Sequence, residues 1–211
     1  MKCVVLTASN VDEIAQEASD VLRASGVIIY PTDTLYGLGG DALSDAAFEK
    51  VCAVKERDER RPIHAIFSDM KMVGEYAEIN ETGQKIAHAF LPGPITLIFN
   101  KKSHVTGGIA RTLGTIGVRI PKNNFCLRLA NVFGGPITTT SANASGKETP
   151  ATIAEIVAQL GECARYVDLA IDGGKLPTNL RSTVVDVRDE PVVLREGVIS
   201  EEAIRKVLSG D

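Results

Sequence analysis

The chain has 211 residues, of which 44 % are apolar and 5 % aromatic, with no Trp and a formal net charge of −4. A chain of this length can bury a core without disulfides. Its net acidity and few aromatic side chains argue against a generally basic nucleic-acid coat protein that binds by base stacking, although a local basic cleft remains compatible with these averages.

In chain order, apolar runs predict strands at 4–7, 27–30, 63–67, 95–100, 114–120, 137–139, 167–171, 183–187 and 192–194. Helical spacing predicts helices at 11–22, 45–55, 70–76, 82–90, 125–133, 151–160 and 200–208. Strands and helices alternate with short Gly/Pro loops and without an internal boundary. This pattern predicts an α/β fold with a mixed sheet, built as one domain over residues 1–211.

Local signals fix several helix ends. Asn10 with Glu13 resembles a capping box, and Ser44 is expected to cap the second helix. Gly26 is expected to stop the first helix, and Gly134 the helix at 125–133.

The cysteines are Cys3, Cys52, Cys126 and Cys163, which form no CxxC pair and no metal-ligand spacing with His. We interpret them as buried thiols in a reducing compartment. The N-terminal apolar run is too short for a signal peptide, and no stretch approaches the ~18 residues of a membrane span. We therefore expect a cytoplasmic protein.

A cluster of charge follows the second helix, where Lys55 and Arg57 precede Arg60 and Arg61. It could be a solvated helix end, in which cations complement the helix dipole. It could also be a phosphate clamp, because arginine forks grip phosphate oxygens and lysine adds a point charge.

The segment 139–146 is dense in hydroxyls and an amide directly after an apolar strand. It is either a polar loop of turn formers or a loop that donates to phosphate and ribose oxygens. It is not a P-loop, since Ser141 stands where the first Gly belongs and Glu148 replaces the Ser/Thr.

Two cations occupy unusual places in apolar runs. Arg119 lies inside an otherwise apolar strand and must find a partner or line a cleft. Arg195 directly follows a predicted strand, so it too must find a partner or line a cleft. Thr32 and Thr34 form a hydroxyl pair after another predicted strand.

No catalytic triad or zinc motif is present. His64, His88 and His104 share no spacing, and we interpret each as structural or surface-exposed. An enzyme without an obvious base indicates chemistry by positioning and charge stabilisation, as in phosphoryl and nucleotidyl transfer.

The ordered motifs resemble the YrdC family over roughly residues 10–200. The motifs are 30–38 (YPTDTLYGL), 55–57 (KER), 91–96 (LPGPIT), 118–121 (VRIP), 141–146 (SANASG), 182–186 (STVVD) and 194–197 (LREG). The resemblance implies a YrdC-like twisted open mixed sheet flanked by helices, with a concave basic cleft and no separate C-terminal domain. It also implies an enzyme that makes threonylcarbamoyl-AMP from L-threonine, bicarbonate and ATP with release of pyrophosphate, for the t6A modification at position 37 of tRNA.

Carried over residue by residue, the resemblance places Lys55 and Arg57 in catalysis. The implied ATP contacts are Lys55, Arg57, Arg61, Thr115, Ser141, Asn143, Thr149 and Arg195. The implied threonine contacts are Thr34, Arg119, Thr139 and Ser182, the third through its backbone. The resemblance also implies that ATP is a substrate and that Mg²⁺ accompanies it, although no protein side chain is identifiable as a metal ligand. The downstream partner that it implies is a tRNA threonylcarbamoyl transferase complex.

The chain departs from the family pattern at Asp58, where a Pro commonly stands, and at Arg61 and Ile66. Ile66 replaces a polar threonine contact of some relatives. One alternative is a protein of the same fold that binds double-stranded RNA or tRNA without this catalysis. Another is a paralogue that carbamoylates or adenylates a different small substrate.

Overall fold

The computed structural model describes residues 1–56, 63–111, 113–177 and 181–209. The strands of these residues join one mixed sheet in the order β1-β9-β2-β3-β8-β4-β7-β6-β10-β11, with β5 paired to β6 off this path. The strands are β1 (Lys2–Val5), β2 (Ile28–Pro31), β3 (Tyr36–Gly39), β4 (His64–Ile66), β5 (Ala77–Glu78), β6 (Ile95–Lys101), β7 (Thr115–Arg119), β8 (Ile137–Ser141), β9 (Leu169–Asp172), β10 (Thr183–Asp186) and β11 (Val192–Arg195).

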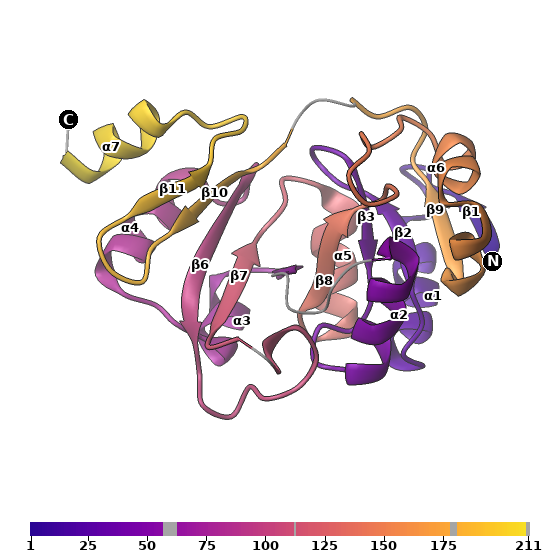
Figure 1. Ribbon diagram of the computed structural model, residues 1–211, viewed down its shortest axis with the longest axis horizontal. Coiled ribbons are helices and arrows are strands. Elements are labelled where there is room, and N and C mark those ends of the chain that lie inside the picture. The colour runs from indigo at the N-terminus through magenta and orange to yellow at the C-terminus, as the bar shows by residue number, and fades with distance from the viewer. Residues whose placement is uncertain (57–62, 112, 178–180, 210–211) are drawn as a thin grey trace.

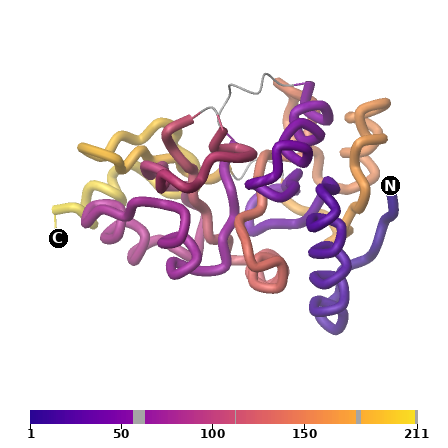
Figure 2. Tube along the Cα trace, turned by 90° about the horizontal axis from the view of Figure 1, so that it is seen from below, coloured from indigo at the N-terminus to yellow at the C-terminus, as the bar shows by residue number. Residues whose placement is uncertain are grey.

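The α-helices are α1 (Val11–Arg23), α2 (Asp45–Lys55), α3 (Met70–Tyr76), α4 (Glu81–Phe90), α5 (Asn124–Phe133), α6 (Ile153–Leu160) and α7 (Glu201–Ser209). Figures 1 and 2 show α1 and α5 on one side of β2, β3 and β8, and α2 and α6 on the other side. Strand β1 and helix α7 lie at opposite ends of the long axis. The predicted α/β fold with a mixed sheet flanked by helices is confirmed.

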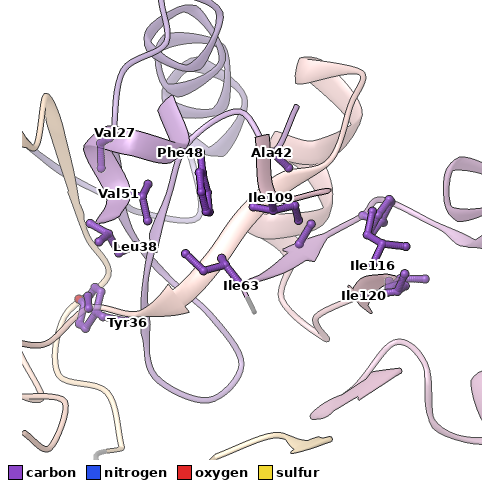
Figure 3. Packing of buried hydrophobic residues seen from close by; sticks show 14 of the residues in the cluster. Val27, Tyr36, Leu38, Ala42, Phe48, Val51, Ile63, Ile109, Ile116 and Ile120 are labelled. Atoms are coloured by element: carbon purple, nitrogen blue, oxygen red, sulfur yellow. The ribbon is translucent and has the colours of Figure 1, made fainter. Parts of the chain in front are cut away.

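Two buried apolar clusters follow from this layering. Helices α1 and α5 pack residues such as Ile14, Leu22 and Leu129 against Ile28 and Ile137 of the sheet. The larger cluster holds α2 and α4 against the sheet, and Figure 3 shows Phe48 and Val51 of α2 directed toward Leu38 and Ile63. Burial of these side chains supplies the main favourable term in folding.

Strand β3 was not predicted from the sequence, because two of its four residues are Gly, which is depleted in strands. The glycines are required by the neighbouring strand. A Cβ on Gly37 would lie 3.0 Å from Cζ of Tyr30, and one on Gly39 would lie 2.3 Å from the carbonyl oxygen of Thr138. The Tyr30 ring therefore occupies the space that side chains on β3 would fill, and its hydroxyl donates to Thr138 O at 3.1 Å.

All seven predicted α-helices form, and so do all nine predicted strands, most of them within two residues of the expected ends. The first strand begins at Lys2 rather than Val4, because it pairs with β9 from Lys2 onward. The two-residue strand β5 was also missed; it is defined by its pairing with β6 and not by a local pattern.

Two of the helix-end predictions are wrong. The Asn10 side chain makes no cap to α1 and instead accepts from Thr7 N at 2.7 Å and donates to Val5 O at 3.0 Å. Ser25, not Gly26, has the left-handed conformation, with φ of 55°. A glycine is needed at position 26 because the backbone there passes close to Val21: a Cβ on Gly26 would lie 2.6 Å from Cγ1 of Val21.

The caps at Ser44 and Gly134 are confirmed: Ser44 Oγ accepts from Ala47 N at 3.2 Å, and Gly134 has φ of 76°. A capping box does occur, between Thr152 and Glu155 at the start of α6. The thiols of Cys52 and Cys126 are buried as expected, whereas Cys3 is exposed and Cys163 half-buried. Among the described residues, no helix is long and apolar enough to cross a membrane.

We predict that Gly39→Ala destabilises the protein. The added Cβ meets a backbone oxygen at 2.3 Å, so two strands must separate, and we expect a loss of about 1–3 kcal/mol in the free energy of unfolding. Gly114→Ala is the matched control, because nothing lies within 4 Å of its Cβ position. Urea denaturation measures both variants; equal stabilities would contradict the close approach of β3 to the Thr138 carbonyl oxygen of β8.

Candidate functional site

A cavity of about 390 Å³ opens over the middle of the sheet. Strands β3, β4, β6, β7, β8 and β11, the end of α2, and the loops after β2, after β8 and before β10 all contribute to its lining. Eight of the predicted site residues line it: Thr34, Lys55, Arg119, Thr139, Ser141, Asn143, Ser182 and Arg195. Residues far apart in the sequence are therefore brought together as the resemblance implied.

The register of the sheet explains this convergence. His64 of β4 stands opposite Gly117 of β7 on one side and opposite Thr139 of β8 on the other. Since successive side chains of a strand alternate between faces, Arg119 and Ser141 project from the same face as His64. The polar positions at strand ends thus form one floor.

Arg119 is a deeply buried cation of the floor, with 7 % of its surface exposed. Its Nη2 donates to Asp33 Oδ1 at 2.5 Å and to Thr34 Oγ1 at 2.7 Å. Asp33 is held in turn by the backbone N–H of Lys122, at 3.1 Å. In the part of the chain that the structure describes, the buried Arg119 Nε has no hydrogen-bond partner, which is rare for a buried donor.

A second group of polar side chains lies across the floor from Thr34. Arg195 donates from Nη2 to the carbonyl oxygen of Ser182 at 3.0 Å and to its Oγ at 3.2 Å. Ser182 Oγ is also 3.3 Å from Thr96 Oγ1. Burial, together with the positive charges of Arg181 and Arg119, lowers the pKa of Arg195 from its ordinary value. A bound anion would relieve this repulsion.

Lys55 connects α2 to the loop after β8. Its Nζ donates to Ser141 O and Asn143 O, each at 2.6 Å, and to Asn143 Oδ1 at 2.7 Å. Ser141 Oγ donates to the same Oδ1 at 2.5 Å. These contacts set the orientation of the Asn143 amide, whose nitrogen donates to Ala144 O and Lys147 O.

The loop after β8 is also fixed from outside the cavity. Gln159 of α6 accepts from Ala144 N at 2.8 Å and donates to Glu148 O at 3.0 Å. The loop therefore presents Ser141, Asn143 and Lys147 to the cavity as a preorganised polar set.

Four predicted positions are not among the lining residues. Thr115 begins β7, four residues before Arg119, and Thr149 is buried in the loop before α6; neither lines the cavity. Arg57 and Arg61 lie outside the described residues. The roles that the resemblance gives to these four residues stay predictions.

Several lining residues were not predicted: Thr32, Tyr36, His64, Thr96, Lys147 and Arg181. Lys147 was passed over because its loop fails the P-loop pattern. His64, which is interpreted from the sequence as structural or surface-exposed, is half-buried and lines the cavity. The signal for His64 is its place two residues before Ile66, on the strand face that Arg119 shares, and only the pairing of β4 with β7 makes it visible.

The polar side chains that line the cavity are either cationic or neutral. Five of its lining residues are Lys or Arg, namely Lys55, Arg119, Lys147, Arg181 and Arg195, and no Asp or Glu belongs to the described lining. Across the described ranges, no group of three or more His, Cys, Asp or Glu side chains could hold a metal ion. The fold and cavity define an α/β protein whose site suits a polar, anionic ligand.

Comparisons with known proteins agree with this class. The Sua5_yciO_yrdC family model, described as "Telomere recombination", matches residues 20–197. The chain belongs to this family.

A Methanocaldococcus jannaschii relative is 39 % identical over 174 residues, covering 82 % of this chain and 80 % of its own. The threonylcarbamoyl-AMP synthase of Pyrococcus abyssi is 35 % identical over 195 residues, covering 90 % of this chain but only 56 % of its own. A structure of Pyrococcus abyssi Sua5 complexed with L-threonine superposes with a TM-score of 0.87 at 30 % identity, covering 98 % of this chain and 60 % of that one. The chain thus spans little more than half of the Pyrococcus protein.

We predict that the buried ion pair beneath the cavity is a stability determinant. Asp33→Asn removes the charge that compensates Arg119, whose side chain is 8 % exposed, and should lower the free energy of unfolding by roughly 3 kcal/mol. Asp12→Asn is the matched control, because its pair with Arg128 is exposed and should change stability by less than about 1 kcal/mol. Equal effects in chemical denaturation would contradict the burial of the Asp33–Arg119 pair.

Proposed function

We propose that this protein makes threonylcarbamoyl-AMP from L-threonine, bicarbonate and ATP, with release of pyrophosphate. The observation that carries the proposal is one cavity in which a buried arginine cradle and a lysine-held donor loop face each other across the same floor. Relatives that are similar over most of the chain are named threonylcarbamoyl-AMP synthases, which supports the reaction. The product would pass to a tRNA threonylcarbamoyl transferase complex for t6A synthesis.

The amino acid would bind at Arg119. A carboxylate can accept from the guanidinium, because Arg119 lines the cavity. Thr34 Oγ1 and Ser182 Oγ supply neutral hydrogen-bonding groups on either side, and Thr139 would contribute its backbone. This set matches a small zwitterion with a hydroxyl group.

ATP would bind along Lys55, Ser141 and Asn143, with Arg195 on the far side of the cavity. Hydroxyl and amide donors suit ribose and phosphate oxygens, and the lysine adds charge. Lys55, together with Arg57 as the resemblance implies, would offset the charge that builds up on the departing pyrophosphate.

Mg²⁺ would accompany ATP. It is commonly held by substrate phosphates and water with one or two carboxylates, and the described lining offers hydroxyls and amides but no carboxylate. The residues present therefore fit a metal that the nucleotide carries, and when bound it would neutralise phosphate charge.

The chemistry is one of positioning. Threonine's amine would form an N-carboxylate with bicarbonate, and that carboxylate would attack the α-phosphorus in line as pyrophosphate leaves. A carbamate and a mixed anhydride both hydrolyse readily, so exclusion of water by the cavity walls matters. Orienting the reactants on one rigid floor supplies the entropic advantage.

The direct test is pyrophosphate release from ATP with bicarbonate, in the presence of L-threonine, L-serine or no amino acid. We expect release that depends on both L-threonine and bicarbonate. Release with another amino acid would point to a different small substrate, and no release with intact tRNA affinity would favour the RNA-binding alternative.

We predict that Arg119→Lys lowers kcat/KM for L-threonine roughly 10- to 100-fold, because lysine keeps the charge but loses the planar fork. The affinity for ATP should stay within a few-fold. Arg128→Lys, at an exposed ion pair with Asp12, serves as the control and should leave the rate unchanged. A wild-type kcat/KM in Arg119→Lys would remove Arg119 from threonine binding.

We predict that Lys55→Ala raises the Kd for ATP at least about tenfold, since a charged donor is lost and the loop it holds is released. Lys50→Ala is the control from the same helix, because Lys50 Nζ donates to Ser25 O at 2.9 Å, outside the cavity lining. Titration calorimetry measures both. Indistinguishable affinities would contradict the placement of ATP at the Lys55 loop.

A further inference from the structure

His64 occupies the centre of the cavity floor. Its Cα is in register with Gly117 of β7 and with Thr139 of β8. Strand β4 runs parallel to β7 and antiparallel to β8, so Arg119 and Ser141 are diagonal neighbours of His64 in opposite directions. Each diagonal is about 7–8 Å. His64 therefore lies midway between the arginine cradle and the loop held by Lys55.

The neighbouring strand makes room for the imidazole. A Cβ on Gly117 would lie 2.5 Å from Cδ2 of His64 and 3.2 Å from its Cβ. The ring thus lies over the backbone of β7 at a glycine, beside Arg119. The residue is half-buried and lines the cavity, so a ligand can reach it.

The proposed reaction uses the neutral amine of the amino acid, which a base beside the amino group would supply. Free L-threonine carries an ammonium group at neutral pH, and only the neutral amine can form a bond to the carbon of bicarbonate. With the carboxylate at Arg119 and the α-phosphate near Ser141, the amine and the new carboxylate must meet over the middle of the floor.

Other lining residues are poor proton acceptors at neutral pH. The remaining titratable or charged side chains of the described lining are Tyr36 from β3, Lys55 from α2, Arg119 from β7, Lys147 from the loop after β8, Arg181 before β10 and Arg195 from β11. Burial raises the pKa of Tyr36 to about 12, and its hydroxyl already donates to Gly174 O at 2.6 Å. Within this set, His64 carries the side-chain type whose ordinary pKa lies closest to neutral pH.

We propose that His64 is a catalytic base that removes one proton from the ammonium group of the bound amino acid. This assignment rests on the proposed function. The proton moves from the ammonium nitrogen to a ring nitrogen of His64, which later returns it to water. The neutral amine then forms the N–C bond to bicarbonate as the C–OH bond breaks, and the hydroxyl leaves as water with the second amine proton. The carboxylate that remains attacks the α-phosphorus, and the bond to the β-phosphate breaks.

The test compares His64→Ala and His64→Asn with the wild-type enzyme in threonine- and bicarbonate-dependent pyrophosphate release between pH 6 and 9. General-base loss should lower kcat/KM for threonine by about 10²- to 10⁴-fold at neutral pH in both variants. The defect should shrink as pH rises, because hydroxide then removes the amine proton. His88→Ala, at an exposed position on α4, is the control and should behave as the wild type.

Calorimetric binding of ATP and L-threonine separates folding from catalysis: both variants should bind each substrate within a few-fold of the wild type. A wild-type rate in His64→Asn, or a defect that stays constant with pH, would overturn the assignment, since hydrogen bonding or shape alone would then explain His64. If the wild type and His64→Ala are both active, the role of His64 as a base is wrong and the proposed function still stands. A wild type that releases no pyrophosphate would overturn both.

Discussion

A buried arginine in a central strand is the constraint on which the rest of the site depends. Arg119 lies in β7 between apolar neighbours, where an uncompensated charge would be costly. Asp33 and Thr34 compensate it from the turn between β2 and β3. That turn can reach Arg119 only because β3 and β8 bring the hairpin beside β4 and β7. The ion pair therefore joins the two halves of the sheet at the cavity floor.

The second half of the site is organised by one lysine. Lys55 ends α2 with its ammonium group on the backbone and amide of the loop after β8. The two cationic centres, Lys55 and Arg119, are anchored independently, and the floor at His64 separates them. An enzyme that joins an amino acid to a nucleotide needs this kind of separation, because each substrate must be held before the bond between them forms.

Most of the fold could be predicted from the sequence because helical and strand periodicity is a local property. Strand β3 could not, since Gly37 and Gly39 are there to accommodate the ring of Tyr30. The motif residues Arg119 and Ser141 could be singled out as unusual from the sequence alone. His64 could not, because its place on the floor depends on strand pairing with residues more than fifty positions away. Contacts of this kind exist only once the sheet is assembled.

The central claim is that one cavity joins threonine, bicarbonate and a nucleotide. The most direct measurement uses ¹⁴C-labelled bicarbonate with ATP and L-threonine, followed by chromatographic and mass-spectrometric identification of the labelled product. The account predicts label in a single nucleotide whose mass equals that of threonylcarbamoyl-AMP, formed in step with pyrophosphate. Pyrophosphate release with only unlabelled AMP or an aminoacyl adenylate would contradict it.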